Sequence, residues 1–169
     1  MDERLIHYSA HPIAALDDAF SYATRPTGFH KPQGLWVSVG EEWREWCEAE
    51  GFSLESLAHE HRVVLHPHAN ILRLRSAEDL DAFTKQYETP MLPERPREKW
   101  NLAIDWAAVR VAHQGVVIAP YIYARRYDLS WYYGWDCASG CIWDLAAIAA
   151  IDPIANSESA PKKQENVDG

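Results

Sequence analysis

The sequence predicts a single domain of the mixed α+β class, and three observations lead to this prediction. Short segments rich in β-branched and aromatic residues, which are typical of strands, lie near both ends of the chain, as in "LIHYS" and "CIWDL". Segments with apolar residues at helical spacing lie between them. A chain of 169 residues, of which 47% are hydrophobic, has the size and composition of one globular domain with a sizeable core.

The first elements are expected to be a strand, a short helix and a second strand. Residues 4–10 alternate enough to predict a strand, and residues 13–22 predict a short helix. Residues 24–34 contain two prolines and two glycines, which predicts a loop. Residues 35–39, "LWVSV", then predict a compact strand.

A helix is expected over residues 40–52. Trp43, Trp46 and Cys47 are three and four positions apart, so they share one face of this helix. Gly51 is suited to end it, because glycine adopts the left-handed conformation of a helix C-terminus without steric cost.

The middle of the chain predicts two strands and another helix. Residues 61–67 and 69–76 are expected to pair across a short turn. Ser76 is a favourable N-cap for a helix over 77–87, and Asp79 three residues later gives an imperfect capping box.

The C-terminal half predicts a loop, a helix and two strands. Three prolines and many charges predict a surface loop over residues 88–99, and residues 100–113 predict a helix with one apolar side. A buried strand is expected over 116–123 and a last strand over 141–145, with 146–151 as its apolar tail.

Composition limits the classes of function and location. We expect one domain over residues 1–153 and a disordered tail over 154–169, which is polar and rich in Ser, Pro and Lys. The start of the chain lacks an apolar leader and the sequence lacks a membrane-spanning run, so we expect a cytoplasmic protein without membrane contact. A net charge of −9 disfavours general nucleic-acid binding, which needs a positive face. Small size and negative charge also suit a protein of a phage or mobile element.

The cysteines and histidines match no familiar metal or redox pattern. Cys137 and Cys141 are four positions apart, and the sequence has no second cysteine pair to complete a structural zinc site. Their spacing also differs from that of a redox-active pair. "HEHRVVLHPH" offers a weak chelate at most, so no metal is expected. A Gly-rich phosphate loop and a nucleophile elbow are both missing from the sequence.

Three segments form a pattern along the chain: "LIHYS" near the start, "GLWVSV" leading into a helix with "WREWC", and "SGCIWDLAAI" near the end. In this order they resemble the ADP-ribosyltransferase family of the diphtheria-toxin and poly-ADP-ribose-polymerase type. The family's corresponding segments read like "LWHGS", "GIYFAD" with a helix ending near "YC", and "EYIVYDIAQV". The resemblance covers three short segments and leaves most of the chain unmatched.

The resemblance implies an ADP-ribosyltransferase-like split β-core with flanking helices. It implies that the protein binds NAD, releases nicotinamide and transfers ADP-ribose to a macromolecular acceptor, expected to be a protein. His7 matches the family histidine that binds the NAD ribose, and Trp36 and Trp46 would bracket nicotinamide. The NAD-binding positions that the resemblance assigns are His7, Tyr8, Ser9, Trp36, Ser38 and Trp46.

The sequence departs from the family at two positions. The family's catalytic glutamate falls on Ser139, which has no negative charge to offer. Asp136, three residues earlier at the entry to the last strand, is the catalytic carboxylate that we expect to act with His7 by stabilising positive charge on the ribose. Asp128 is a weaker candidate. Tyr8 stands where the family often has glycine, which would crowd the cofactor.

Each site residue also has a purely structural interpretation. His7 can be a hydrogen-bonded core histidine, the tryptophans can fill the core, and Asp136 can bind backbone N–H groups in a turn. Arg125 and Arg126 can be solvated or can contact phosphate. The rival function is a non-catalytic protein-binding module, an inhibitor or adaptor, because "YARRYDLSWYYGWD" is rich in the residues that protein interfaces favour.

Overall fold

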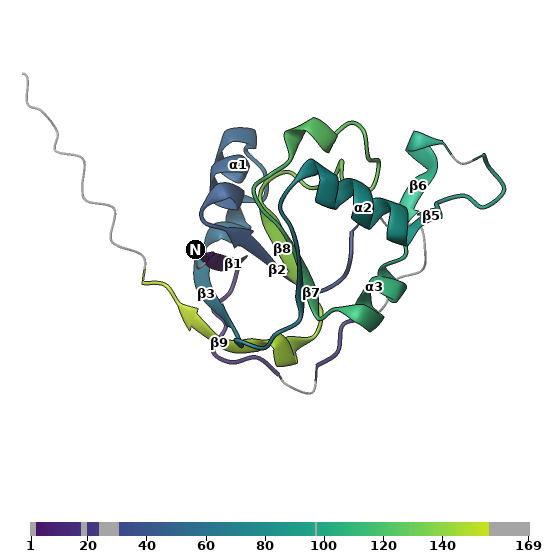
Figure 1. Ribbon diagram of the computed structural model, residues 1–169. Coiled ribbons are helices and arrows are strands. Elements are labelled where there is room, and N and C mark those ends of the chain that lie inside the picture. The colour runs from purple at the N-terminus through teal and green to yellow at the C-terminus, as the bar shows by residue number, and fades with distance from the viewer. Residues whose placement is uncertain (1–2, 18–19, 24–30, 97, 156–169) are drawn as a thin grey trace, which may run out of the picture.

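The computed structural model describes residues 3–17, 20–23, 31–96 and 98–155 (Figure 1). These ranges form a mixed α+β fold, as predicted, with one seven-stranded sheet, one two-stranded sheet and three α-helices. Most of the tail expected over 154–169 lies outside the described residues. Ile154 is described, and its N–H donates to the carbonyl of Glu60 at 2.8 Å. None of the helices in these ranges has the length and apolar character needed to cross a membrane.

The bounds of the elements are as follows. The strands of the large sheet are β1 (Leu5–Ser9), β2 (Leu35–Val39), β3 (His59–Leu65), β4 (Ile71–Leu74), β7 (Gly115–Ile118), β8 (Ser139–Ile142) and β9 (Ile148–Pro153). The small sheet pairs β5 (Glu88–Pro90) with β6 (Leu102–Ile104). The helices are α1 (Glu42–Glu50), α2 (Ala77–Tyr87) and α3 (Trp106–Ala112).

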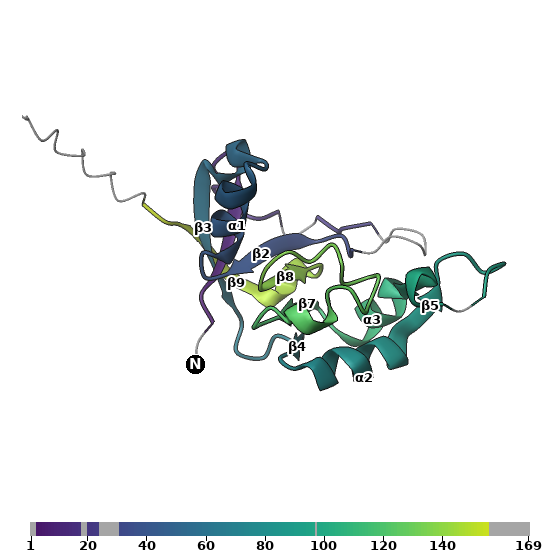
Figure 2. The ribbon, with the colours of Figure 1, turned by 90° about the horizontal axis from the view of Figure 1, so that it is seen from above.

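The large sheet opens between β1 and β2. Its order is β4-β7-β8-β2-β1-β3-β9, and β4 with β7 is its parallel pair. β1 pairs with β3 over five positions and β2 with β8 over four, but β1 and β2 pair at only two, Leu5 with Val39 and Ile6 with Ser38. In Figure 2, β1, β3 and α1 stand apart from the layer that contains β2, β8, β7 and the other two helices. We call this β1–β2 junction the seam.

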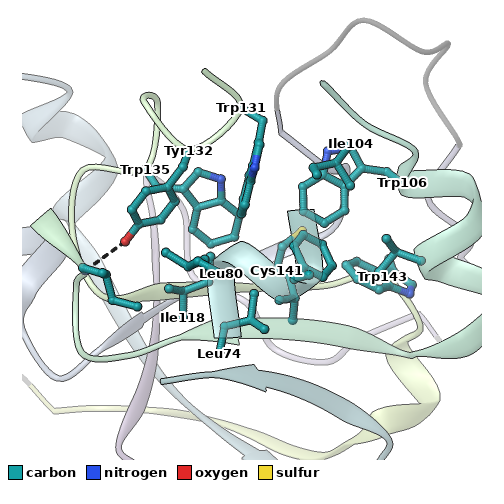
Figure 3. Packing of buried hydrophobic residues seen from close by; sticks show 14 residues of the cluster. Leu74, Leu80, Ile104, Trp106, Ile118, Trp131, Tyr132, Trp135, Cys141 and Trp143 are labelled. Carbon is teal, nitrogen blue, oxygen red and sulfur yellow. Dashed lines mark hydrogen bonds between the residues drawn. The ribbon is translucent and has the colours of Figure 1, made fainter. Parts of the chain in front are cut away.

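The larger core packs aromatic rings between the β4-β7-β8 side of the sheet, α2, α3 and the segment before β8 (Figure 3). Trp131, Tyr132 and Trp135 are fully buried there, next to Trp106 and Trp143. Burying one large apolar side chain contributes about 2 kcal/mol. Four of the eight tryptophans therefore serve the core, in line with the structural interpretation of the tryptophan excess.

The helix predicted over residues 13–22 is wrong for the part of that range that is described. Residues 13–17 and 20–22 contain no helix. The Ile13 N–H donates to Nε2 of His61 at 3.0 Å, and Leu16 and Tyr22 pack against the core cluster around Leu5 and Leu35. These contacts anchor the segment without helical structure, and a ten-residue helix has little stability of its own.

The local signals for α1 and α2 are confirmed. Gly51 ends α1 with φ of 63°, and its N–H donates to the carbonyl of Cys47. Ser76 caps α2 by accepting the Asp79 N–H, and the Asp79 carboxylate accepts the Ser76 N–H in return, which completes the capping box.

The hairpin predicted from residues 61–67 and 69–76 is wrong. Both segments contain strands, but β3 lies between β1 and β9, whereas β4 lies at the opposite edge beside β7. The Asn70 N–H donates to the side-chain oxygen of Gln114 at 2.9 Å, and the Asn70 carbonyl accepts the Gln114 N–H at 2.8 Å. These long-range bonds direct the chain toward β7 instead of back along β3.

The helix predicted over residues 100–113 forms only in its second half. The side chain of fully buried Asn101 accepts the Leu92 N–H and donates to the Leu92 carbonyl, and residues Lys99–Asn101 form a short 3-10 helix that leads into β6. Asp105 then starts α3 by accepting the Ala108 N–H at 3.1 Å. The loop predicted over 88–99 likewise begins with a strand, β5.

The two C-terminal strands also differ from their predicted bounds. The strand expected over 116–123 ends at Ile118, and the strand expected over 141–145 is β8, which begins at Ser139. The apolar tail expected over 146–151 is largely β9, a strand of its own that pairs with β3 at the edge of the sheet.

Candidate functional site

A pocket of about 330 Å³ lies at the seam. This volume is near the lower end of the range for ligand pockets, about 300–1,000 Å³. Residues of β1, β2, α1 and the segment that leads into β8 line it; the side chains used below are His7, Lys31, Trp36, Ser38, Trp43, Asp136 and Ser139.

Five of the seven sequence-predicted site residues line this pocket, namely His7, Tyr8, Trp36, Ser38 and Asp136. Ser9 and Trp46 are not among its lining residues. The Ser9 hydroxyl donates to the carbonyl of His11 at 2.7 Å, within its own turn. Trp46 stacks on Trp43, with ring centroids 5.1 Å apart, and packs against Phe52. Trp43, one turn earlier on α1, lines the pocket in place of Trp46.

His7 spans the seam. Its Nδ1 lies 2.7 Å from the carbonyl oxygen of Trp36, beyond the last position at which β1 and β2 pair. A carbonyl oxygen only accepts, so Nδ1 carries the proton, and in a neutral ring Nε2 is then an acceptor. His7 is therefore suited to accept a hydrogen bond from a ligand hydroxyl.

The surroundings of His7 favour its neutral form. Burial lowers the pKa of His7 below 6.5; the hydrogen bond to the Trp36 carbonyl opposes this shift, and the nearby His61 adds to it. The neutral ring leaves Nε2 without a proton at neutral pH.

This lowered pKa predicts a pH dependence of stability. The unfolded chain binds a proton at His7 more tightly than the folded protein, so stability is fully present above pH 6.5 and declines as the pH falls below 6.5 toward the lower folded pKa. We expect His7→Gln, whose amide can still donate to Trp36, to lose this part of the decline. Urea unfolding at pH 7.5 and 5.5 measures how much stability the wild-type protein and His7→Gln each lose on acidification. An equal loss of stability in the two proteins would contradict a lowered pKa of His7.

Asp136 is the carboxylate among the pocket's lining residues. Its Oδ1 accepts a hydrogen bond from Arg126 at 3.0 Å, and both side chains are less than a fifth exposed. Arg126 also donates to the Tyr121 hydroxyl at 2.9 Å. Arg126 is thus an ion-pair partner rather than a solvated residue, and Arg125 likewise holds Asp81 with two hydrogen bonds.

Two serines face each other where β2 and β8 pair. Ser38 is opposite Ser139 in the register, and both line the pocket. The Ser38 hydroxyl oxygen accepts the Trp43 N–H at 3.0 Å, which ties the start of α1 to β2. The hydrogen of that hydroxyl can still be donated to a ligand. Ser139, at the position of the family glutamate, donates to the Cys137 carbonyl.

Lys31 is a lining residue that the sequence reasoning missed. Its Nζ lies 5.1 Å from the ring centroid of Trp36. Burial lowers the pKa of Lys31, and nearby Asp136 opposes that shift. A lone basic residue in a loop resembles any solvated lysine, so neither periodicity nor spacing could have marked it.

The cysteines near the pocket are buried free thiols. Burial raises the pKa of Cys137 to about 12, and burial also raises that of Cys141. These thiols are therefore protonated at neutral pH, which is the wrong state for a nucleophile or a metal ligand. Within the described ranges, no group of three or more His, Cys, Asp or Glu side chains is placed to hold a metal ion.

No protein-family model, curated protein or solved structure matches this chain. The resemblance to ADP-ribosyltransferases therefore depends on the residues of three segments and on where the fold places them.

Proposed function

We propose that this protein is an NAD-dependent ADP-ribosyltransferase with a split β-core. The observation that carries the proposal is that His7, Trp36 and Asp136, which come from three distant parts of the sequence, line one pocket. The strands that carry the resemblance, β1, β2 and β8, are consecutive in the sheet. The short pairing of β1 with β2, at two positions, is compatible with the split β-core that we propose.

The lining residues fit the chemical needs of this reaction. NAD supplies the ADP-ribosyl group, and nicotinamide leaves with the bonding electrons. The rings of Trp36 and Trp43 offer flat apolar surface for nicotinamide. Nε2 of His7 accepts a hydrogen bond from a ribose hydroxyl, which orients the sugar.

Asp136 carries the catalytic part of the proposal. Positive charge develops on the ribose as its bond to nicotinamide breaks, and a fixed carboxylate stabilises that charge more than it stabilises the ground state. The hydrogen bond from Arg126 holds the carboxylate in place before the substrate arrives. The same ion pair offsets part of the negative charge of Asp136. The Arg126–Asp136 pair therefore forms an oriented dipole with the carboxylate as its negative end.

Incubation of the protein with NAD tests this proposal. We expect nicotinamide to be released with time, and millimolar NAD to raise the melting temperature because NAD binds the folded form. His7→Ala should weaken both effects, whereas His68→Ala, which changes an exposed histidine on the turn after β3, should weaken neither. If a folded protein shows no nicotinamide release and no shift of its melting temperature with NAD, the proposal is contradicted.

That negative outcome would favour a protein-binding module, for which the structure offers a specific surface. A groove of about 470 Å³ is lined by Met91, Trp100, Arg126, Tyr127 and Tyr133, among others. Tyr127 and Tyr133 are 62% and 55% exposed. Exposed tyrosine, tryptophan and arginine are typical of protein interfaces.

A further inference from the structure

Lys31 brings into the seam pocket a positive charge that forms no ion pair with the described carboxylates, although Asp136 is near enough to favour it. Asp136, which lines the same pocket, forms its ion pair with Arg126 at 3.0 Å, and none of the ion pairs of the described residues includes Lys31. Its Nζ instead faces the ring of Trp36. A half-buried ammonium that has no ion-pair partner among the described residues is costly, so a ligand that supplies an anion gains from this arrangement.

The stem of Lys31 packs against a glycine. A Cβ atom added at Gly134 would lie 3.3 Å from Cε of Lys31, closer than side chains normally approach. The backbone at this position therefore leaves room for the lysine to reach the pocket. Contact with Gly134 and with the Trp36 ring gives the ammonium a defined place in the site.

A ligand ring that stacks on this face of Trp36 has to displace the ammonium. The nicotinamide ring of NAD is itself positively charged and would repel the ammonium from the shared face. The four-carbon stem lets the ammonium move, and phosphate is its strongest available partner. The chain as a whole has a net charge of −9, so an anionic ligand needs such a local cation to bind.

We propose that Lys31 binds the phosphate of an incoming nucleotide, so that the pocket selects the phosphate-bearing nucleotide over the matching nucleoside. The inference deepens the proposed function, on which it rests for the choice of NAD as the ligand. It assigns a specificity role to a residue that has no part in the chemical step.

Calorimetric titration of the full chain with NAD and with nicotinamide riboside, which lacks phosphate, tests this role. Both titrations use an Asp136→Asn background to suppress turnover. Adding Lys31→Met removes the charge and keeps an unbranched apolar stem. We expect this change to weaken NAD binding about 10-fold or more, as loss of a hydrogen bond to a charged group does. Riboside binding should not weaken, because its positively charged ring gains nothing from the ammonium. Lys31→Arg should restore most of the NAD affinity.

The outcomes separate this inference from the proposed function. Lys31-dependent binding of NAD by a protein that never releases nicotinamide would support the phosphate site and contradict the transferase. Nicotinamide release with an unchanged KM in Lys31→Met would support the transferase and contradict the phosphate site. Equal weakening of NAD and riboside by Lys31→Met would also overturn the inference, because it would indicate a general loss of pocket structure. Absence of binding of either ligand would contradict both.

Discussion

Replacing Asp136 with asparagine is expected to lower nicotinamide release from NAD by about 100-fold or more, the usual effect of removing one preorganised electrostatic group. Asparagine keeps an oxygen that can accept the hydrogen bond from Arg126, so the pocket should keep its shape. The affinity for NAD should change far less, because only interactions that strengthen in the transition state speed the reaction. Steady-state release assays and NAD titrations measure the two effects separately.

Asp128→Asn is the matched control for this substitution. Asp128 is the weaker carboxylate candidate from the sequence; its side chain is 53% exposed, and it pairs with Lys99 instead of lining the seam pocket. We expect this variant to keep full turnover. Full turnover in Asp136→Asn, or loss of turnover in Asp128→Asn, would show that the catalytic carboxylate is assigned to the wrong residue.

Replacing Trp131 with alanine is expected to lower the free energy of unfolding by about 3–5 kcal/mol. The side chain is fully buried, and its ring lies 5.4 Å from that of Phe83 and 6.0 Å from that of Trp106. Its Nε1 donates to the Thr84 hydroxyl oxygen at 2.9 Å, so the change also takes away a buried hydrogen-bond partner. Urea unfolding followed by circular dichroism measures the loss.

Trp100→Ala makes the same chemical change at a side chain that is 48% exposed. Surface substitutions of this kind change stability by about 0.5 kcal/mol or less. Similar losses for Trp100→Ala and Trp131→Ala would contradict the placement of Trp131 in the core.

The elements that the sequence predicts well carry their own local signals. The ends of α1 and α2 follow from Gly51 and from the Ser76–Asp79 capping box, which act within a few residues. The pairing of strands has no such local signal. β3 and β4 are close in sequence and far apart in the sheet, because Asn70 binds Gln114 across the fold.

The candidate site could be predicted only in part, because long-range contacts decide which side chains reach the pocket. His7 and Trp36 come from the family resemblance, Asp136 is inferred from its place three residues before the family's glutamate position, and the fold brings all three to one pocket. Helical spacing places Trp43 and Trp46 on one face of α1 but does not say which of them reaches the seam. Lys31 reaches the pocket with its stem packed closely against Gly134, a contact between residues far apart in the sequence.

A crystal structure of the Asp136→Asn protein soaked with NAD tests the central claim most directly. We expect the nicotinamide end of NAD in the seam pocket, with a ribose hydroxyl within hydrogen-bond distance of His7 Nε2, about 2.7–3.0 Å. The side chain at position 136 should face the ribose. NAD bound at another surface, or a seam pocket without NAD at saturating concentration, would contradict the claim that this pocket is an ADP-ribosyltransferase site.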